Sequence, residues 1–269
     1  MKIHVLFIGL CLTFTISSFG QFKKGNSGIP NLQANNSRSD TVDILNYTIN
    51  LNITDFTTKV ISGNTAVKFT PKMNGVSYLN LDLLKMTIDS IKFSGATLVY
   101  NYNDTLLRVT LPTTHNIGDT STATVYYHGV PKTDALWGGF YFNGGYAFNL
   151  GVGFAADPHC FGRVWFPCFD NFVERSTYKF NITTNGGKVA YCNGTLTKDT
   201  TDGSGNRTTT WVMNHEIPSY LANVAVATYT EVRQQYNGIN GTIPIVLTAL
   251  AADTANIKNS FRGVLKIEC

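Results

Sequence analysis

Residues 45–53 read Leu-Asn-Tyr-Thr-Ile-Asn-Leu-Asn-Ile, and this alternation decides the fold class. Every second position, from Leu45 to Ile53, is apolar, and the positions between them carry only Asn and Thr. Successive side chains of a β-strand point to opposite faces, so a period of two predicts a strand with one row on a core and one row in water.

Short stretches that read as further strands recur along most of the chain. They are residues 59–69, 76–82, 87–93, 98–102, 106–111, 123–130, 139–142, 146–150, 177–183, 188–192 and 208–213. Many short strands with turn signals between them predict an all-β fold, an antiparallel saddle-shaped β-sandwich. We expect Asn103-Asp104 to form a hairpin turn, and Pro112 to end the strand that follows it.

The two ends of the chain differ from this β region. Lys2 precedes an apolar run at residues 5–14 that is too short to span a bilayer, which is typical of a signal peptide. Ser18-Phe19-Gly20 then predicts cleavage before Gln21 and an exported protein, periplasmic or secreted. The sequence therefore predicts four segments along the chain: a signal peptide at 1–20, a flexible leader at 21–40, a β domain at 41–232, and the truncated start of a second domain at 233–269.

The second domain is predicted to open with one strand at 243–247 and one helix at 251–269.

Composition excludes several classes of function for the chain as a whole. Only 14% of residues are charged, and the net charge of +4 is not gathered into basic runs, so a nucleic-acid partner is not expected. We also expect no transmembrane segment, because no second stretch approaches about 20 apolar residues.

Four cysteines remain after the predicted cleavage: Cys160, Cys168, Cys192 and Cys269. Export makes disulfides chemically possible, and four thiols allow three complete pairings, between which the spacing does not choose. The alternative is a zinc site built from His159, Cys160, Cys168 and Cys192, but the spacing matches no paired Cys-x-x-Cys pattern. We expect buried structural cysteines, with at most one bonded pair.

Residues 163–170, Arg-Val-Trp-Phe-Pro-Cys-Phe-Asp, resemble a segment of the aminopeptidase N and leukotriene hydrolase-type zinc metallopeptidases, the gluzincin aminopeptidases. Three further blocks follow in that family's order: residues 175–180, Asn193-Gly194, and Pro218-Ser-Tyr-Leu-Ala-Asn-Val-Ala-Val226. The resemblance covers roughly residues 41–269. It implies an N-terminal β saddle that precedes a thermolysin-like catalytic domain, with the chain truncated before the catalytic motif.

The resemblance also implies an activity for the parent polypeptide, a zinc-dependent aminopeptidase acting on peptides. Its zinc would be held by His-Glu-x-x-His on a helix, a motif that this chain lacks. The closest match, His215-Glu-Ile-Pro-Ser219, has serine in place of the second histidine and a proline that would break a helix. We therefore expect no metal in this segment and no activity from it alone. Its partners would be a peptide substrate and its own catalytic domain beyond residue 269.

The resemblance implies one candidate substrate-binding residue, Asp157. In the family, a Gln-x-Glu loop before the Phe-Pro-Cys segment binds the free amino terminus of the substrate, and counting back from Phe166 places that loop at 156–158. A buried ammonium group needs a paired anion, which Asp157 would provide. Alternatively, Asp157-Pro158 begins a turn and the aspartate caps its own backbone. The chain departs from the family here, and also in having Asn171-Phe172 in place of Glu-Pro.

Two charges and three aromatic residues within the resembling segment have structural interpretations. Arg163 and Asp170 are expected to form an ion pair, because charges in an apolar segment need partners. Trp165, Phe166 and Phe169 are expected to pack in a core or at a domain interface rather than stack on a ligand.

Two alternatives stay open at this point. One is a non-catalytic, exported β-sandwich that binds carbohydrate or protein, since such sandwiches serve many functions. The other is a member of the same family whose metal site has been lost, which would carry the same N-terminal blocks.

Overall fold

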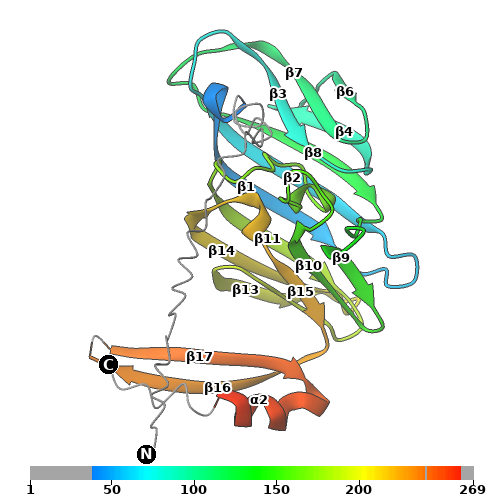
Figure 1. The fold of residues 1–269 in the computed structure, drawn as a ribbon, viewed down its shortest axis with the longest axis vertical. Helices are drawn as coiled ribbons and strands as arrows, with labels where there is room; N and C mark the ends of the chain where they lie inside the picture. Colours follow the sequence, from blue (N-terminus) through cyan, green and yellow to red (C-terminus); the bar gives the residue numbers. More distant parts are fainter. Residues whose placement is uncertain (1–37, 240, 262–269) are drawn as a thin grey trace, which may run out of the picture. The chain divides into compact units, whose positions relative to one another are not determined.

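The computed structural model describes residues 38–239 and 241–261, and most of them lie in β-strands (Figure 1). The predicted signal peptide, the predicted leader up to residue 37 and the end of the predicted C-terminal helix lie outside the described residues. The predicted all-β class with antiparallel sheets is confirmed.

The described residues form the following elements in chain order. The strands are β1 (Val42–Asn52), β2 (Ile61–Pro71), β3 (Val76–Asp82), β4 (Thr87–Phe93), β5 (Ala96–Thr97), β6 (Tyr100–Tyr102), β7 (Leu106–His115), β8 (Ser121–Gly129), β9 (Gly138–Asn143), β10 (Tyr146–Gly153), β11 (Ser176–Thr184), β12 (Val189–Cys192), β13 (Thr195–Thr201), β14 (Arg207–Ile217), β15 (Val224–Ala227), β16 (Tyr229–Gly238) and β17 (Gly241–Leu250). The helical elements are a helical stretch at residues 38–41, the single turns η1 (Gly162–Val164), η2 (Ser219–Leu221) and η3 (Ala251–Asp253), and the helix α2 (Thr254–Phe261). Residues 38–40 were expected to belong to a flexible leader, but they are helical and Ser39 is buried.

Strand β1 lies in the middle of the largest sheet, whose order is β13-β14-β11-β1-β2-β8-β4-β5 (Figure 1). It pairs antiparallel with β2 and parallel with β11, and this parallel pair joins two segments about 130 residues apart, so that Asn50 lies opposite both Asn64 and Asn181. The other sheets are β12-β15-β10-β9, β3-β7-β6 and the hairpin β16-β17, and all their pairs are antiparallel.

The alternation that predicted β1 is present with one local shift. Tyr47, Ile49 and Leu51 are at most 2% exposed, as expected for a core-facing row. Leu45 does not belong to that row. The pairing register of β1 with β2 shifts between Ile44 and Asn46, so Ile44 is buried in place of Leu45. A β-bulge of this kind moves the side chains that follow it to the opposite face.

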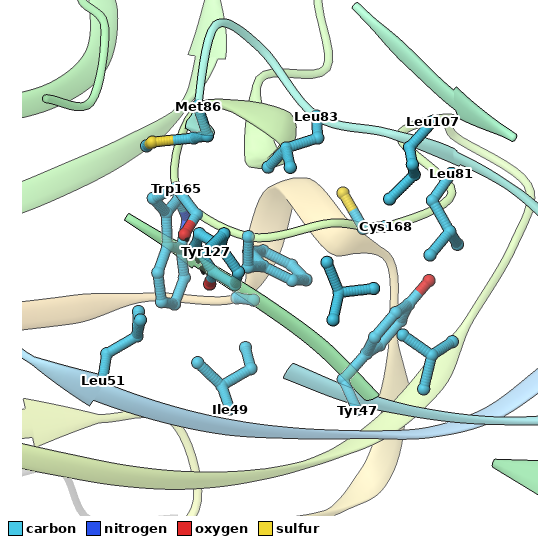
Figure 2. Close-up of a cluster of buried hydrophobic side chains, with 14 of the residues drawn as sticks. Tyr47, Ile49, Leu51, Leu81, Leu83, Met86, Leu107, Tyr127, Trp165 and Cys168 are labelled. Atoms are coloured by element: carbon cyan, nitrogen blue, oxygen red, sulfur yellow. Dashed lines mark hydrogen bonds between the residues drawn. The ribbon is translucent and has the colours of Figure 1, made fainter. Parts of the chain in front are cut away.

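One face of the large sheet forms the core together with the sheets β12-β15-β10-β9 and β3-β7-β6 and residues 161–171. Apolar side chains from all of these elements belong to a single buried cluster. Figure 2 shows Trp165 and Cys168 in the same buried cluster as the β1 residues Tyr47, Ile49 and Leu51. Residues 161–171 therefore act as a layer of the core, although they contain no strand.

Hydrogen bonds hold this irregular segment on the sheets. The Tyr127 hydroxyl donates to the Trp165 carbonyl at 2.9 Å, and the Phe169 N–H donates to the Tyr47 hydroxyl at 2.9 Å. Cys168 exchanges two backbone hydrogen bonds with Asp82 at the end of β3, at 2.7 and 3.0 Å. A buried loop must satisfy its backbone polar groups, and this one does so through tyrosine hydroxyls and a strand end.

The predicted turn at Asn103-Asp104 is confirmed. It joins β6 to β7, and the Asn103 side chain accepts hydrogen bonds from the N–H groups of Thr105 and Leu106.

The prediction that Pro112 ends the strand is wrong. Strand β7 continues to His115 and pairs again with β3 there. Pro112 is tolerated because it lies in the stretch where the register is interrupted and no ladder hydrogen bond is needed from it.

Several elements were not predicted from the sequence or differ from the prediction. Strand β13 was not predicted, because its residues are all exposed and carry no apolar row. Strand β16 was not predicted either, and it pairs along its full length with β17. The predicted helix begins with the single turn η3 and continues as α2, which is described as far as Phe261. None of the helices in the described part of the chain is long and apolar enough to cross a membrane.

We expect the hydroxyl of Tyr47 to contribute measurably to stability. In Tyr47→Phe, the ring remains but the buried N–H of Phe169 loses its acceptor, which should lower the free energy of unfolding by about 1–3 kcal/mol. Urea unfolding of the purified chain measures this change. The matched control Tyr126→Phe removes a hydroxyl from a partly exposed ring and should change stability by less than about 0.5 kcal/mol. Equal effects of the two substitutions would contradict the assignment.

Candidate functional site

Asp157, the predicted substrate-binding residue, lies on the loop that leaves β10 and leads to η1. Its side chain is exposed and, among the described residues, makes no hydrogen bond and no ion pair. The carboxylate therefore does not cap the turn that begins at the cis peptide bond between Asp157 and Pro158. It is an anion without a counter-charge from the part of the chain that the structure describes.

The loop around Asp157 is tied at both ends. The Gly153 N–H donates to the His159 carbonyl at 2.9 Å, and the His159 ring Nδ1 lies 2.9 Å from the Gly153 carbonyl. The Arg163 guanidinium donates to the carbonyls of Cys160 at 2.9 Å and of Pro158 at 3.4 Å. These contacts fix the backbone on either side of Asp157 and leave its side chain free.

A second aspartate, Asp134, joins this loop to the one that precedes β9. Its carboxylate accepts backbone hydrogen bonds from Leu136 at 2.9 Å, Trp137 at 3.0 Å and Ala155 at 2.9 Å. Desolvation acts to raise the pKa of Asp134, but these backbone hydrogen bonds outweigh it and lower the pKa below its ordinary value. Asp134 is therefore an ionised positioning group between two loops.

The predicted ion pair between Arg163 and Asp170 is confirmed. Arg163 Nη1 lies 3.2 Å from Asp170 Oδ2, and the Asp170 side chain is completely buried. The same carboxylate accepts hydrogen bonds from Gly162 N–H at 3.1 Å and from the Ser219 hydroxyl at 2.8 Å. Burial raises the pKa of Asp170 above its ordinary value, and Arg163 opposes the rise. The pair thus holds η1 and η2 to the core.

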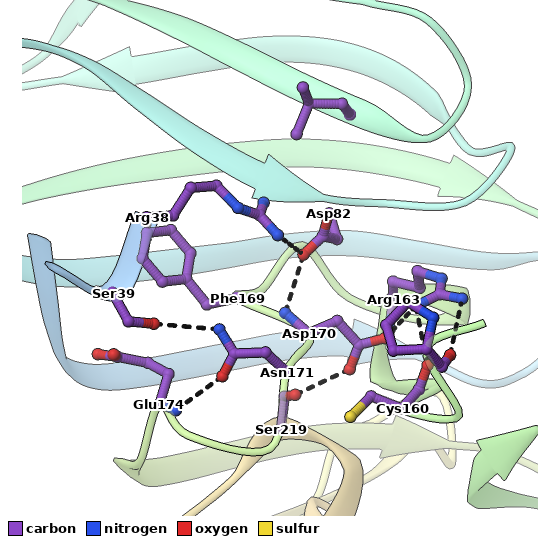
Figure 3. Close-up of polar contacts among 12 residues, drawn as sticks. Arg38, Ser39, Asp82, Cys160, Arg163, Phe169, Asp170, Asn171, Glu174 and Ser219 are labelled. Atoms are coloured by element: carbon purple, nitrogen blue, oxygen red, sulfur yellow. Dashed lines mark hydrogen bonds and ion pairs between the residues drawn. The ribbon is translucent and has the colours of Figure 1, made fainter. Parts of the chain in front are cut away.

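This ion pair belongs to a wider buried network (Figure 3). Asp82 accepts hydrogen bonds from Asp170 N–H at 2.9 Å and from the Arg38 guanidinium at 2.7 Å. Glu174, one of the few buried carboxylates, accepts a hydrogen bond from the Ile44 N–H of β1 at 2.7 Å. Asn171, which departs from the family's glutamate, accepts from Glu174 N–H at 2.7 Å. These contacts connect the start of the domain, β1 and the loop region.

The aromatic side chains and cysteines of residues 160–169 are buried in the core. Trp165 and Phe166 are fully buried and Phe169 is 2% exposed, which confirms that they pack in the core. Cys160 and Cys168 are buried free thiols, and burial raises the pKa of both, which favours the neutral form over the metal-binding thiolate.

The remaining metal candidates do not come together. Cys192 is also a free thiol, and Cys269 lies outside the described residues. Within residues 38–239 and 241–261, no group of three or more His, Cys, Asp or Glu side chains could hold a metal ion. His215 and Glu216, the nearest match to a zinc-binding motif, are exposed residues of strand β14 and not of a helix.

Sequence reasoning missed Asp134 and Glu174. Neither lies in a motif, and each accepts hydrogen bonds from residues far away in the chain: Ala155 is 21 residues from Asp134, and Ile44 is 130 residues from Glu174. Only the signal of a possible Asx turn at Asp134, which bonds the N–H groups two and three residues later, was readable from the sequence.

The fold and this segment define the chain as a β domain whose core is closed by the Arg-x-x-Phe-Pro-Cys-Phe-Asp stretch. A family model described as the peptidase M1 N-terminal domain matches residues 44–221, more than half of the 269 residues. The chain therefore belongs to the peptidase M1 N-terminal domain family. Comparison with curated proteins gives no match.

Solved structures show the same fold. The M1 zinc metallopeptidase from Deinococcus radiodurans superposes with a TM-score of 0.68 at 20% identity, over 78% of this chain and 48% of that one. A mutant of that enzyme bound to a Tyr-Ser-Ala substrate gives 0.69 with the same identity and coverage. A mutant two-domain M1 zinc metallopeptidase bound to L-arginine gives 0.71 at 19% identity, over 84% and 52%. The chain spans about half the length of these structures.

We expect Asp170→Asn to destabilise the domain strongly. The substitution leaves the largely buried Arg163 guanidinium without its counter-charge, which costs about 3 kcal/mol or more for a buried pair. Denaturant unfolding measures the loss. The control Asp199→Asn breaks the more exposed pair between Asp199 and Arg207 and should cost less than about 1 kcal/mol. A small effect of Asp170→Asn would show that the buried pair does not hold the loops.

Proposed function

We propose that this chain is the N-terminal, non-catalytic part of an exported, zinc-dependent aminopeptidase, in which it shapes the substrate entrance and binds the substrate amino terminus through Asp157. The observation that carries the proposal is the free carboxylate of Asp157 on a loop held at both ends, in a chain that belongs to the M1 N-terminal domain family. Export rests on the signal peptide predicted at residues 1–20.

The chemistry of an exopeptidase supports this role for Asp157. The enzyme must recognise a positively charged amino terminus, and a carboxylate at a fixed position both neutralises the ammonium group and sets which peptide bond is presented for cleavage. Asp157 is suited to this because its side chain is not used by the described part of the chain, whereas Asp134, Asp170 and Glu174 are all occupied by hydrogen bonds.

Zinc chemistry belongs, in this proposal, to residues beyond this segment. The described residues offer no group of ligands that fits the metal, so no catalytic step is assigned to them. The N-terminal domain is taken as residues 41–232, and residues 233–269 as the start of the catalytic domain. Peptides and that catalytic domain are then the partners of the segment.

Asp157→Asn in the parent polypeptide should weaken recognition of the amino terminus. Replacing the carboxylate by an amide removes a charge-assisted hydrogen bond to ammonium, which should lower kcat/KM for aminoacyl p-nitroanilides by about 10- to 100-fold. The measurement is steady-state kinetics with the unfolding midpoint as a check on folding. Asp104→Asn, an exposed aspartate in the β6–β7 turn, is the control and should have no effect. An unchanged kcat/KM in Asp157→Asn would remove Asp157 from the site.

The 269-residue chain by itself should not hydrolyse aminoacyl p-nitroanilides, with or without added zinc. Its described residues lack a metal-binding group, and its sequence lacks His-Glu-x-x-His. The release of p-nitroaniline, followed by absorbance with the parent polypeptide as the positive control, tests this. Turnover by the isolated chain that a chelator abolishes would contradict the proposal that the zinc ligands lie elsewhere.

A further inference from the structure

Two aromatic side chains next to the Asp157 loop are exposed. Trp137, which directly precedes β9, is 45% exposed, and Phe154, which directly follows β10, is 60% exposed. Their ring centroids lie 5.0 Å apart, so the two rings contact each other; we call them the aromatic pair. Leu136 beside them is 75% exposed. Exposed apolar side chains that cluster in this way mark a binding surface more often than isolated ones do.

The backbone that carries the aromatic pair is held in place. The Phe154 N–H donates to the Trp137 carbonyl at 3.0 Å, which links the two residues directly. Asp134 accepts hydrogen bonds from the N–H groups of Trp137 and of Ala155, the residue after Phe154. A surface whose backbone is fixed before binding loses less conformational entropy when a ligand arrives.

Glycine at position 138 allows the two loops to approach. Gly138 has a φ of +114°, and a Cβ atom added there would lie 1.6 Å from the Val152 carbonyl oxygen. No other residue type could occupy this position without separating the start of β9 from the end of β10. The close approach places Trp137 beside Phe154, which is two residues after Val152.

The free carboxylate of Asp157 lies on the same loop, three residues after Phe154. Residues 153 and 159 are joined by hydrogen bonds, so the segment between them, which carries both Phe154 and Asp157, is a closed loop. An anion and an apolar surface are thus presented together. The first residue of a peptide has the complementary features, because its ammonium group and its side chain are attached to the same carbon atom.

We propose that the aromatic pair binds the side chain of the first residue of the peptide substrate, and that it selects peptides with an aromatic or large aliphatic amino-terminal residue. The inference rests on the proposed function, since it places the ammonium group at Asp157. A large apolar side chain gains from covering the two rings, whereas a small one leaves them in water and an acidic one is repelled by the carboxylate.

The test compares two substrates on the parent polypeptide: the p-nitroanilides of phenylalanine and of alanine. The quantity measured is the ratio of their kcat/KM values in the wild type, Trp137→Ala, Phe154→Ala and the double variant. We expect the preference for phenylalanine to fall by about 2- to 10-fold in each single variant, as expected for the loss of an aromatic contact. Trp137→Phe, which keeps a ring, should retain most of the preference.

Two controls separate selectivity from folding and from the amine site. Tyr126→Ala removes an exposed aromatic side chain from β8 and should leave the ratio unchanged. Asp157→Asn should lower both kcat/KM values but keep their ratio, because the ammonium group is common to the two substrates. The unfolding midpoint of each variant shows whether it is folded.

Three outcomes would overturn the inference. An unchanged ratio in the double variant would show that the aromatic pair does not contact the side chain. An equal loss with both substrates, together with a lower unfolding midpoint or a changed oligomeric state, would assign the pair to a contact between domains or between copies of the chain. If the wild-type polypeptide turned over neither substrate, the proposed function would fail and this inference with it.

Discussion

The fold depends on the covering of strand β1 by residues 161–171. This irregular segment contributes the fully buried rings of Trp165 and Phe166 to the core, where a sheet alone would leave one face of β1 in water. Its backbone groups can be buried because they are bonded to the hydroxyls of Tyr47 and Tyr127 and to Asp82 at the end of β3. Apolar burial supplies the driving force, and these hydrogen bonds remove the desolvation penalty of the buried backbone groups that would otherwise oppose it.

The same segment determines where the exposed loop lies. Its Arg163 is paired with the buried Asp170 and also donates to the carbonyls of residues 158 and 160. The buried network therefore reaches the backbone beside Asp157, and Asp134 fixes the opposite side. The unpaired carboxylate and the exposed aromatic pair lie on loops held in this way and do not contribute to the core, which is why we propose a role in recognition for them.

The family match identifies the domain, and the geometry locates the exposed groups that could bind a substrate. The match over residues 44–221 shows which domain this is, while the likeness to solved metallopeptidases at about 20% identity shows the fold alone. The proposed role of Asp157 comes from its place in the sequence before the Phe-Pro-Cys segment. The structure adds that its carboxylate is exposed and is not paired with any described residue. The aromatic pair comes only from the structure, because Trp137 and Phe154 are 17 residues apart and belong to no motif.

By itself, the sequence determined the all-β class, most of the strands, the structural packing role of Trp165 and Phe166, and the family, because alternation and a contiguous motif are local signals. Tertiary structure decided what depends on distant partners. The bulge that buries Ile44 in place of Leu45 follows from pairing with β2, and the exposed strand β13 forms only because β14 provides an edge. Asp134 likewise acquires its role from a loop 21 residues away. Hydrogen bonds between remote segments leave no periodic trace in the chain, so these features became visible only once it was folded.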